Sequence, residues 1–227
     1  MSIAKELTPR LMQVAQQVPE CETCADIGCD HAQVSIYLAS SGRVKKMLAA
    51  DVNQGPLSRA KAAVSQAGLD EHISCVRTDG LEGISPQDSV VIAGMGGDLI
   101  ADILAKAEWT CKEGVTLVLQ PMTAAERLRE FLSHSGYEIL RESYVYAREK
   151  LYVIITATAG EGRIRDESEL YISRAGQAHP LACDYAERLV HKLSLEISGL
   201  MRAECPDDEE IAHRRDIVSA LQRRFNI

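Results

Sequence analysis

The chain has 227 residues, of which 46% are hydrophobic and 26% charged, a composition typical of one globular domain with a small appendage. No run reaches about 18 consecutive apolar residues and the amino terminus lacks an apolar signal core, so we expect neither a membrane span nor secretion. The net charge of −8 argues against bulk attraction to a nucleic acid, so any RNA contact must come from local basic patches. Seven irregularly spaced cysteines, an odd number, indicate reduced thiols and a cytoplasmic location.

Short apolar runs alternate with amphipathic helical patterns from residue 24 to residue 159. In the pattern over 55–67, Leu57, Ala60 and Val64 recur on one face and Gly68 follows the last turn, as expected of a helix. Such alternation is typical of βαβ units, so we predict an α/β fold with a parallel sheet. The predicted strands are 24–28, 46–51, 73–77, 89–93, 115–120, 137–146 and 151–159, and the predicted helices are 33–40, 55–67, 98–107 and 124–133.

The last two predicted strands are separated only by residues 147–150, which are too few for a parallel crossover. They are therefore expected to form an antiparallel hairpin. A mostly parallel sheet that ends in such a hairpin resembles the Rossmann-like sheet of class I methyltransferases more than that of a dehydrogenase.

Beyond residue 160 the sequence becomes more polar and helical. Apolar residues recur at spacings of three and four from Leu181 to Leu200, and a second apolar stripe runs from Ile211 to Phe225. The acidic stretch 207–210 between them favours the start of the second helix through the helix dipole. These patterns predict one domain over residues 1–160 and a C-terminal antiparallel helical hairpin, a coiled coil, over residues 161–227.

The segment 26–32 closes the first predicted strand and opens the first helix. Gly28 permits the tight turn, and the helix amino terminus behind it can receive a ligand. A dinucleotide fingerprint would have a second glycine where this chain has Asp30. Asp26 and Asp30 would repel a pyrophosphate, whereas they would attract the ammonium and sulfonium groups of S-adenosylmethionine. The alternative is a plain strand–turn–helix with a capping aspartate.

Two further acidic turns follow the second and third predicted strands. In nucleotide-binding sheets an acid at the position of Asp51 accepts hydrogen bonds from ribose hydroxyls, with Val52 and Asn53 beside it. Asp79, followed by Gly80, lies where an adenine amino group would donate. Each could instead be an ordinary turn, because Asp-Gly is a turn signal more often than a site.

A glycine-rich loop over 93–97 follows the fourth predicted strand. The loop contains three glycines, Gly94, Gly96 and Gly97, and ordering them costs backbone entropy, which argues against a loop without a function. Glycine also allows a ligand to approach the backbone closely. Together with Met95, this strand end is expected to face the transferred methyl group. The loop differs from the Asn-Pro-Pro-Tyr type that methylates exocyclic amines. Gln120 ends the neighbouring strand and offers a side-chain amide at the same rim.

A cluster of Cys21, Cys24, Cys29 and His31 could be taken for a metal site. A structural zinc site normally uses two loop-borne pairs of ligands, whereas Cys24 starts a core strand, so we expect no metal. His31 beside Asp30 could act as a base, orient the loop or touch the cofactor.

These motifs together resemble the bacterial tRNA (adenine-N1)-methyltransferases that act on adenosine 22. The chain departs from the family at Cys29, where threonine is usual, and at Ser35, where proline is usual. The matching segments are 10–11, 26–32, 36–38, Asp51, 55–57, 79–81, 93–97, 120–121 and 150–152.

The resemblance implies methyl transfer from S-adenosylmethionine to N1 of a tRNA adenine. Because N1 carries an in-plane lone pair, positioning should dominate over base catalysis, and the adenine must leave its stack. The expected cofactor-binding residues are Asp26, Gly28, Asp30, His31, Asp51, Val52, Asn53, Asp79, Gly80, Gly94 and Met95. The expected catalytic residues, at the base pocket, are Arg10, Asp30, His31, Gly96, Gly97 and Gln120.

The C-terminal hairpin carries two arginine pairs, Arg214-Arg215 and Arg223-Arg224, which do not all share one stripe; we expect several of them to face the RNA backbone at the outer end of the hairpin. The alternative is a solvated surface that balances the acidic residues 207–210. Two alternatives stay open: a methyltransferase for a small molecule, and a non-catalytic module that binds the methyl donor and docks a protein through the hairpin.

Overall fold

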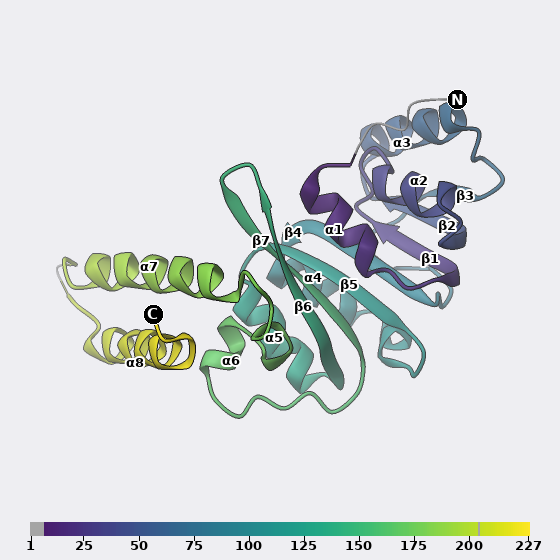
Figure 1. Ribbon diagram of the computed structural model, residues 1–227. Coiled ribbons are helices and arrows are strands. Elements are labelled where there is room, and N and C mark those ends of the chain that lie inside the picture. Colours follow the sequence, from purple (N-terminus) through teal and green to yellow (C-terminus); the bar gives the residue numbers. More distant parts are fainter. Residues whose placement is uncertain (1–6, 204) are drawn as a thin grey trace.

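The computed structural model describes residues 7–203 and 205–227 and shows a seven-stranded sheet with helices on both faces (Figure 1). The strands are β1 (Cys21–Ile27), β2 (Val44–Asp51), β3 (Ile73–Arg77), β4 (Ser89–Gly96), β5 (Thr116–Thr123), β6 (Tyr137–Ala147) and β7 (Lys150–Ala159). The helices are α1 (Pro9–Gln17), α2 (Gln33–Ser40), α3 (Gln54–Ala67), α4 (Gly97–Ala105), α5 (Ala125–His134), α6 (Ser168–Tyr171), α7 (Ala182–Leu200) and α8 (Asp208–Phe225), with 3-10 turns η1 (Glu108–Cys111) and η2 (Arg174–Gly176).

The strand order is β3-β2-β1-β4-β5-β7-β6, and the first five strands run parallel. β7 is antiparallel to both β5 and β6, so the predicted terminal hairpin is confirmed. Its loop is tighter than expected, because Ala147 pairs with Lys150 and only residues 148–149 connect the strands. The Rossmann-like methyltransferase sheet predicted from the sequence is therefore present.

Two hydrophobic clusters fill the space between the sheet and its helices. On one face, α1, α2 and α3 pack on strand residues such as Val91, Val118 and Ile154. On the other, α4 and α5 pack on residues such as Ile92 and Leu119. Aliphatic side chains build both clusters, as the scarcity of aromatic residues requires. The amphipathic α1 was not among the predicted helices; the Thr8 side chain caps it by accepting the N–H of Leu11.

The helices α7 and α8 form the predicted helical hairpin, which projects beside α5 and α6 (Figure 1). Ala186 and Leu193 of α7, with Leu221 and Phe225 of α8, belong to the same hydrophobic cluster as the α4 face of the sheet. The core is therefore continuous across residue 160. Among the described residues, no helix is long and apolar enough to cross a bilayer.

A buried ion pair ties the C-terminal segment to the sheet. Arg129 of α5 binds both carboxylate oxygens of Glu142, with its Nε 2.6 Å from Oε1, and donates to the Leu170 carbonyl at 2.9 Å. The Tyr144 hydroxyl donates to the same carboxylate at 2.7 Å, and its ring stacks on Tyr185 of α7. Desolvation lowers the pKa of Arg129, but the charge and hydrogen bond of Glu142, together with Tyr185 and Tyr144, raise it overall.

Two of the four hairpin arginines are engaged within the protein and are not directed towards a partner. Arg224 is half-buried and donates to the carbonyls of Ile172 (2.7 Å) and Ser173 (3.2 Å), so it holds α8 against the preceding segment. Arg214 pairs with Glu196 and Glu210 and so joins α8 to α7. The other two arginines of these pairs, Arg215 and Arg223, are exposed and available to a partner.

Candidate active site

The carboxyl ends of the five parallel strands meet at one edge of the sheet. The strand order reverses between β1 and β4, and at such a switch point the two following helices leave to opposite faces and open a crevice. A cavity of about 250 Å³ lies there. Six of the residues predicted from the sequence line it: Arg10, Asp26, Gly28, Asp30, His31 and Gly94.

The turn from β1 into α2 is held in an unusual backbone conformation. Gly28 has φ +72°, a left-handed conformation that favours glycine, and a Cβ there would also displace the end of the Met95 side chain, whose methyl carbon would lie 2.3 Å away. Asp30 (φ +46°) and Ala32 (φ +51°) are also left-handed, which costs energy for residues with a Cβ. The N–H groups of Gly28 and Cys29 donate to the Ala50 carbonyl at 2.8 and 3.0 Å and fix the turn against β2.

Asp26 points into the cavity from the end of β1 and is almost fully buried. Burial raises the pKa of its carboxyl to about 6, although a hydrogen bond of 2.6 Å from the Ser35 hydroxyl opposes the shift. Asp51 adds to the shift by charge repulsion. Ser35, noted in the sequence only as a departure from the family, is therefore the residue that solvates Asp26.

The loop acids lie at the same edge in different settings. Asp51 is the last residue of β2 and accepts the N–H of Asn53 at 2.9 Å, while Val52 is exposed beside them. Asp79 lines a separate cavity of about 740 Å³ that also contains Trp109. The structure thus brings Asp51 and Asp26 close, whereas Asp79 adjoins a neighbouring hollow.

Asp30 and His31 form the exposed lip of the cavity. One Asp30 oxygen lies 2.9 Å from the Arg59 Nη2 of α3, and the other lies 3.8 Å from the His31 Nε2. More than half of the Asp30 side chain is exposed, so the pair with Arg59 is screened by solvent. Asp30 therefore remains available to a cation in the cavity.

Cys24 and Cys29, two members of the candidate metal cluster, have structural roles. Cys24 is fully buried in β1, and burial raises the pKa of both the Cys24 and Cys29 thiols, which keeps them protonated and poor metal ligands. Within residues 7–203 and 205–227, no three side chains of histidine, cysteine, aspartate or glutamate are grouped to hold a metal ion.

The segment predicted as a glycine-rich loop instead continues β4 to Gly96, with irregular register against β5, and its glycines have different tasks. Gly94 has φ +83°, and a Cβ there would lie 3.6 Å from the Arg10 guanidinium. A Cβ at Gly96 would lie 3.2 Å from the Thr123 hydroxyl, a side-chain contact. A Cβ at Gly97 would lie 2.2 Å from the backbone oxygen of Ala124, so Gly97 is needed where α4 packs on the end of β5. Gly97 is therefore required for the packing of α4 on β5 and not for contact with the cavity.

Gln120 is fully buried at the end of β5 and orients Arg10. Its side-chain oxygen accepts a hydrogen bond from the Arg10 guanidinium, and its amide donates to the Pro121 carbonyl at 2.8 Å. The sequence predicts Gln120 at the carboxyl edge of the sheet. In the structure both the side-chain oxygen and the side-chain nitrogen of Gln120 are hydrogen-bonded.

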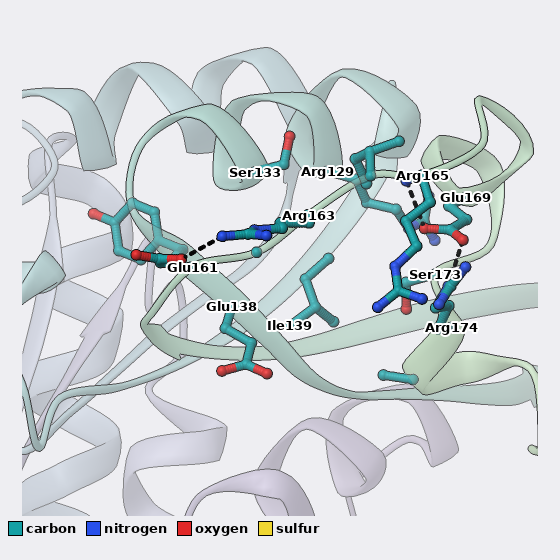
Figure 2. A pocket seen from close by; sticks show the side chains of 14 residues that line it. Arg129, Ser133, Glu138, Ile139, Glu161, Arg163, Arg165, Glu169, Ser173 and Arg174 are labelled. Atoms are coloured by element: carbon teal, nitrogen blue, oxygen red, sulfur yellow. Dashed lines mark hydrogen bonds and ion pairs between the residues drawn. The ribbon is translucent and has the colours of Figure 1, made fainter.

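A second cavity of about 250 Å³ lies at the opposite edge of the sheet, beside Tyr137 at the start of β6. Figure 2 shows Arg163 beside Glu161 at one end and Arg174 beside Glu169 at the other. These pairs are 2.9 and 2.5 Å long, so the charges of the walls are largely balanced. This cavity belongs to the junction with the C-terminal segment rather than to the acidic crevice.

A family model described as a methyltransferase domain matches residues 7–155, which include the whole crevice. The chain belongs to this family. Among curated proteins, the tRNA (adenine(22)-N(1))-methyltransferase of Bacillus subtilis is 38% identical over 160 residues. That alignment covers 69% of this chain and 66% of the relative, slightly less than two thirds of its length.

Solved structures extend the likeness to the C-terminal hairpin. M. capricolum TrmK in complex with S-adenosyl-homocysteine has a TM-score of 0.83 at 25% identity, covering 98% of this chain and 99% of that one. Streptococcus pneumoniae Sp1610 in complex with S-adenosyl-L-methionine has a TM-score of 0.80 at 29% identity, covering 97% and 100%. The B. subtilis m1A22 tRNA methyltransferase TrmK has a TM-score of 0.81 at 27% identity, covering 95% and 98%. The resemblance drawn from the sequence motifs is confirmed.

Proposed function

We propose that this protein transfers the methyl group of S-adenosylmethionine to N1 of adenosine 22 in tRNA. The observation that carries the proposal is the acidic crevice at the switch point, in a chain similar over its full length to solved TrmK structures. A tRNA substrate agrees with the cytoplasmic location expected from the sequence.

The residues of the crevice fit S-adenosylmethionine. Asp26 and Asp30 supply negative charge for its ammonium and sulfonium groups. Asp51 uses one oxygen for the Asn53 N–H, which leaves, within the described part of the chain, the other oxygen without a protein donor and open to ribose hydroxyls. The carboxylates would oppose a pyrophosphate at the same place, which argues against a dinucleotide.

The reaction requires the protein mainly to position the two reactants. S-adenosylmethionine supplies an activated methyl group, and adenine N1 attacks with a lone pair that needs no deprotonation. The left-handed turn at Gly94 lets a flat base approach the backbone, and Arg10, held by the buried Gln120, borders the same space. Bringing the two reactants into line can supply several powers of ten in rate, so no general base is required.

We assign the donor site to residues 1–160 and a role in holding tRNA to residues 161–227. Arg215 and Arg223 are exposed on α8, where they could contact phosphates without reading sequence. Because the hydrophobic core crosses residue 160, this division describes roles rather than parts that fold separately.

Asp51→Ala is expected to weaken donor binding by at least roughly tenfold, since hydrogen bonds to a charged acceptor contribute about 1.5–3 kcal/mol. Titration calorimetry of the purified variant with S-adenosylmethionine measures the effect. Asp51→Asn keeps an acceptor for the Asn53 N–H and should lose less. Unchanged affinity in a folded Asp51→Ala protein would remove this residue from the site.

Donor affinity is also expected to depend on pH through Asp26. The pKa of Asp26 in the free protein is about 6, and a cationic donor prefers the ionised carboxylate, so binding should release a proton. The Kd should therefore rise as pH falls below about 6, by up to roughly tenfold per pH unit, and level off above neutrality. Ser35→Ala removes a hydrogen bond that lowers this pKa and should move the transition to higher pH. A pH-independent Kd between pH 5 and 7.5 would contradict the role of Asp26.

The test of the proposed function follows labelled methyl from the donor into three fractions: tRNA, small metabolites and protein-bound donor. Label in tRNA is the expected result. Label in small molecules would instead support a small-molecule methyltransferase, and donor binding without transfer would support a non-catalytic module.

A further inference from the structure

Tyr152 belongs to residues 150–152, one of the segments that resemble the family. None of the roles assigned to the donor site involves this segment. Tyr152 lies near the start of β7, where it pairs with Val145 of β6, and three residues later Ile155 pairs with Leu119 of β5. Tyr152 therefore lies past the last β5–β7 pair, alongside the carboxyl-terminal end of β5. Its partner Val145 packs in the cluster on the α1 face, so the tyrosine ring lies on that face too.

Arg10 connects Tyr152 with the donor cavity. Its guanidinium carbon lies 5.7 Å from the centre of the Tyr152 ring, while the same group donates to Gln120 and approaches Gly94. Arg10 is half-buried, and desolvation lowers its pKa, although the nearby Tyr152 opposes this. Because Arg10 also lines the acidic cavity, one side chain borders both that cavity and the face of the Tyr152 ring.

We propose that the target adenine stacks on Tyr152 and is covered by Arg10, an inference that rests on the proposed function. Extruded bases stack on aromatic rings and on guanidinium planes, and both are present here. A base held between them needs roughly 7 Å, twice a contact distance of about 3.5 Å, so Arg10 must withdraw by only 1–2 Å or so. The long arginine side chain can make that movement.

The charge that develops in the reaction favours stacking on Tyr152. The new bond forms between adenine N1 and the methyl carbon as the bond from sulfur to that carbon breaks, so the positive charge passes from the sulfonium to the base. The face of the Tyr152 ring attracts a cation. Stacking on Tyr152 therefore stabilises the base more as the transfer proceeds, and its loss should lower kcat as well as tRNA affinity.

The test compares Tyr152→Ala, Tyr152→Leu and Tyr152→Phe with Tyr146→Ala as the matched control. Tyr146 lies one position along the same hairpin, on the opposite face, and also has an arginine, Arg188, 5.3 Å above its ring. Base–aromatic stacking is worth about 1–3 kcal/mol, so alanine and leucine should lower kcat/KM for tRNA by roughly 5- to 150-fold. Phenylalanine and the Tyr146 control should stay within about twofold.

Donor affinity measured by calorimetry should be unchanged in all four variants. The leucine variant keeps apolar bulk, so it separates loss of stacking from loss of packing if the alanine variant folds poorly. Wild-type kcat/KM in Tyr152→Leu would overturn the stacking proposal while leaving the proposed function standing. Absence of methyl transfer to tRNA by the unaltered protein would instead refute the proposed function itself.

Discussion

Gly96→Val is expected to leave donor binding intact and to lower methyl transfer to tRNA by about a hundredfold or more. Gly96 has φ −67° and ψ 148°, a conformation that valine adopts readily, so the backbone does not oppose the change. The new side chain would lie against Thr123 at the end of β5, where its Cβ would be 3.2 Å from the threonine hydroxyl, and this is the side from which we expect the base to enter. A displacement of about 1 Å from the reactive geometry can cost a hundredfold in rate.

Gly97→Ala is the control for this result. Its Cβ would lie 2.2 Å from the Ala124 oxygen and 2.8 Å from the Ala124 carbonyl carbon, which are backbone atoms that cannot rotate away. The variant should lose thermal stability and, with it, donor binding. Normal turnover by Gly96→Val, measured by label transfer and calorimetry, would place the base pocket elsewhere.

Arg129→Met is expected to destabilise the protein by about 3–5 kcal/mol, because it leaves the Glu142 carboxylate buried without its partner. In a chain of this size each kcal/mol shifts the melting temperature by about 2–4 °C, so calorimetry should show a drop of roughly 6–20 °C. The double variant Arg129→Met/Glu142→Leu removes both charges and should recover part of the loss.

Arg127→Met on the same helix is the matched control. Arg127 also pairs with a carboxylate, Asp98 at 2.7 Å, but its side chain is 63% exposed whereas that of Arg129 is 1% exposed. An exposed pair contributes only about 0–1 kcal/mol. Equal effects of the two substitutions would show that burial does not decide the energetics of the Arg129–Glu142 pair.

The periodicity of apolar residues was sufficient to predict the sheet. The strand Ile73–Arg77 appears with the predicted bounds, and the helix predicted over 55–67 begins one residue earlier. The short connection after β6 predicted the antiparallel hairpin, because chain length alone excludes a crossover. The acids after β1 and β2 could be placed at one edge since parallel strands end together.

What the sequence could not show depends on contacts between distant residues. Arg10 and Tyr152 are far apart in the chain and meet only because α1 folds over the ends of β5 and β7. The burial of Asp26 beneath Ser35 and the packing of Gly97 on Ala124 are likewise tertiary features. Which hairpin arginines are free to meet a partner is also a tertiary feature, because local charge does not show that Arg224 is directed towards the carbonyl of Ile172.

Nucleoside mass spectrometry on a pair of tRNA transcripts tests the central claim most directly. One transcript carries adenosine at position 22 and the other guanosine, and both are incubated with the full-length protein and S-adenosylmethionine. The account predicts one N1-methyladenosine per molecule in the first transcript and none in the second. Equal methylation of both transcripts, or methylation of neither while a small molecule in the same extract acquires the methyl group, would contradict it.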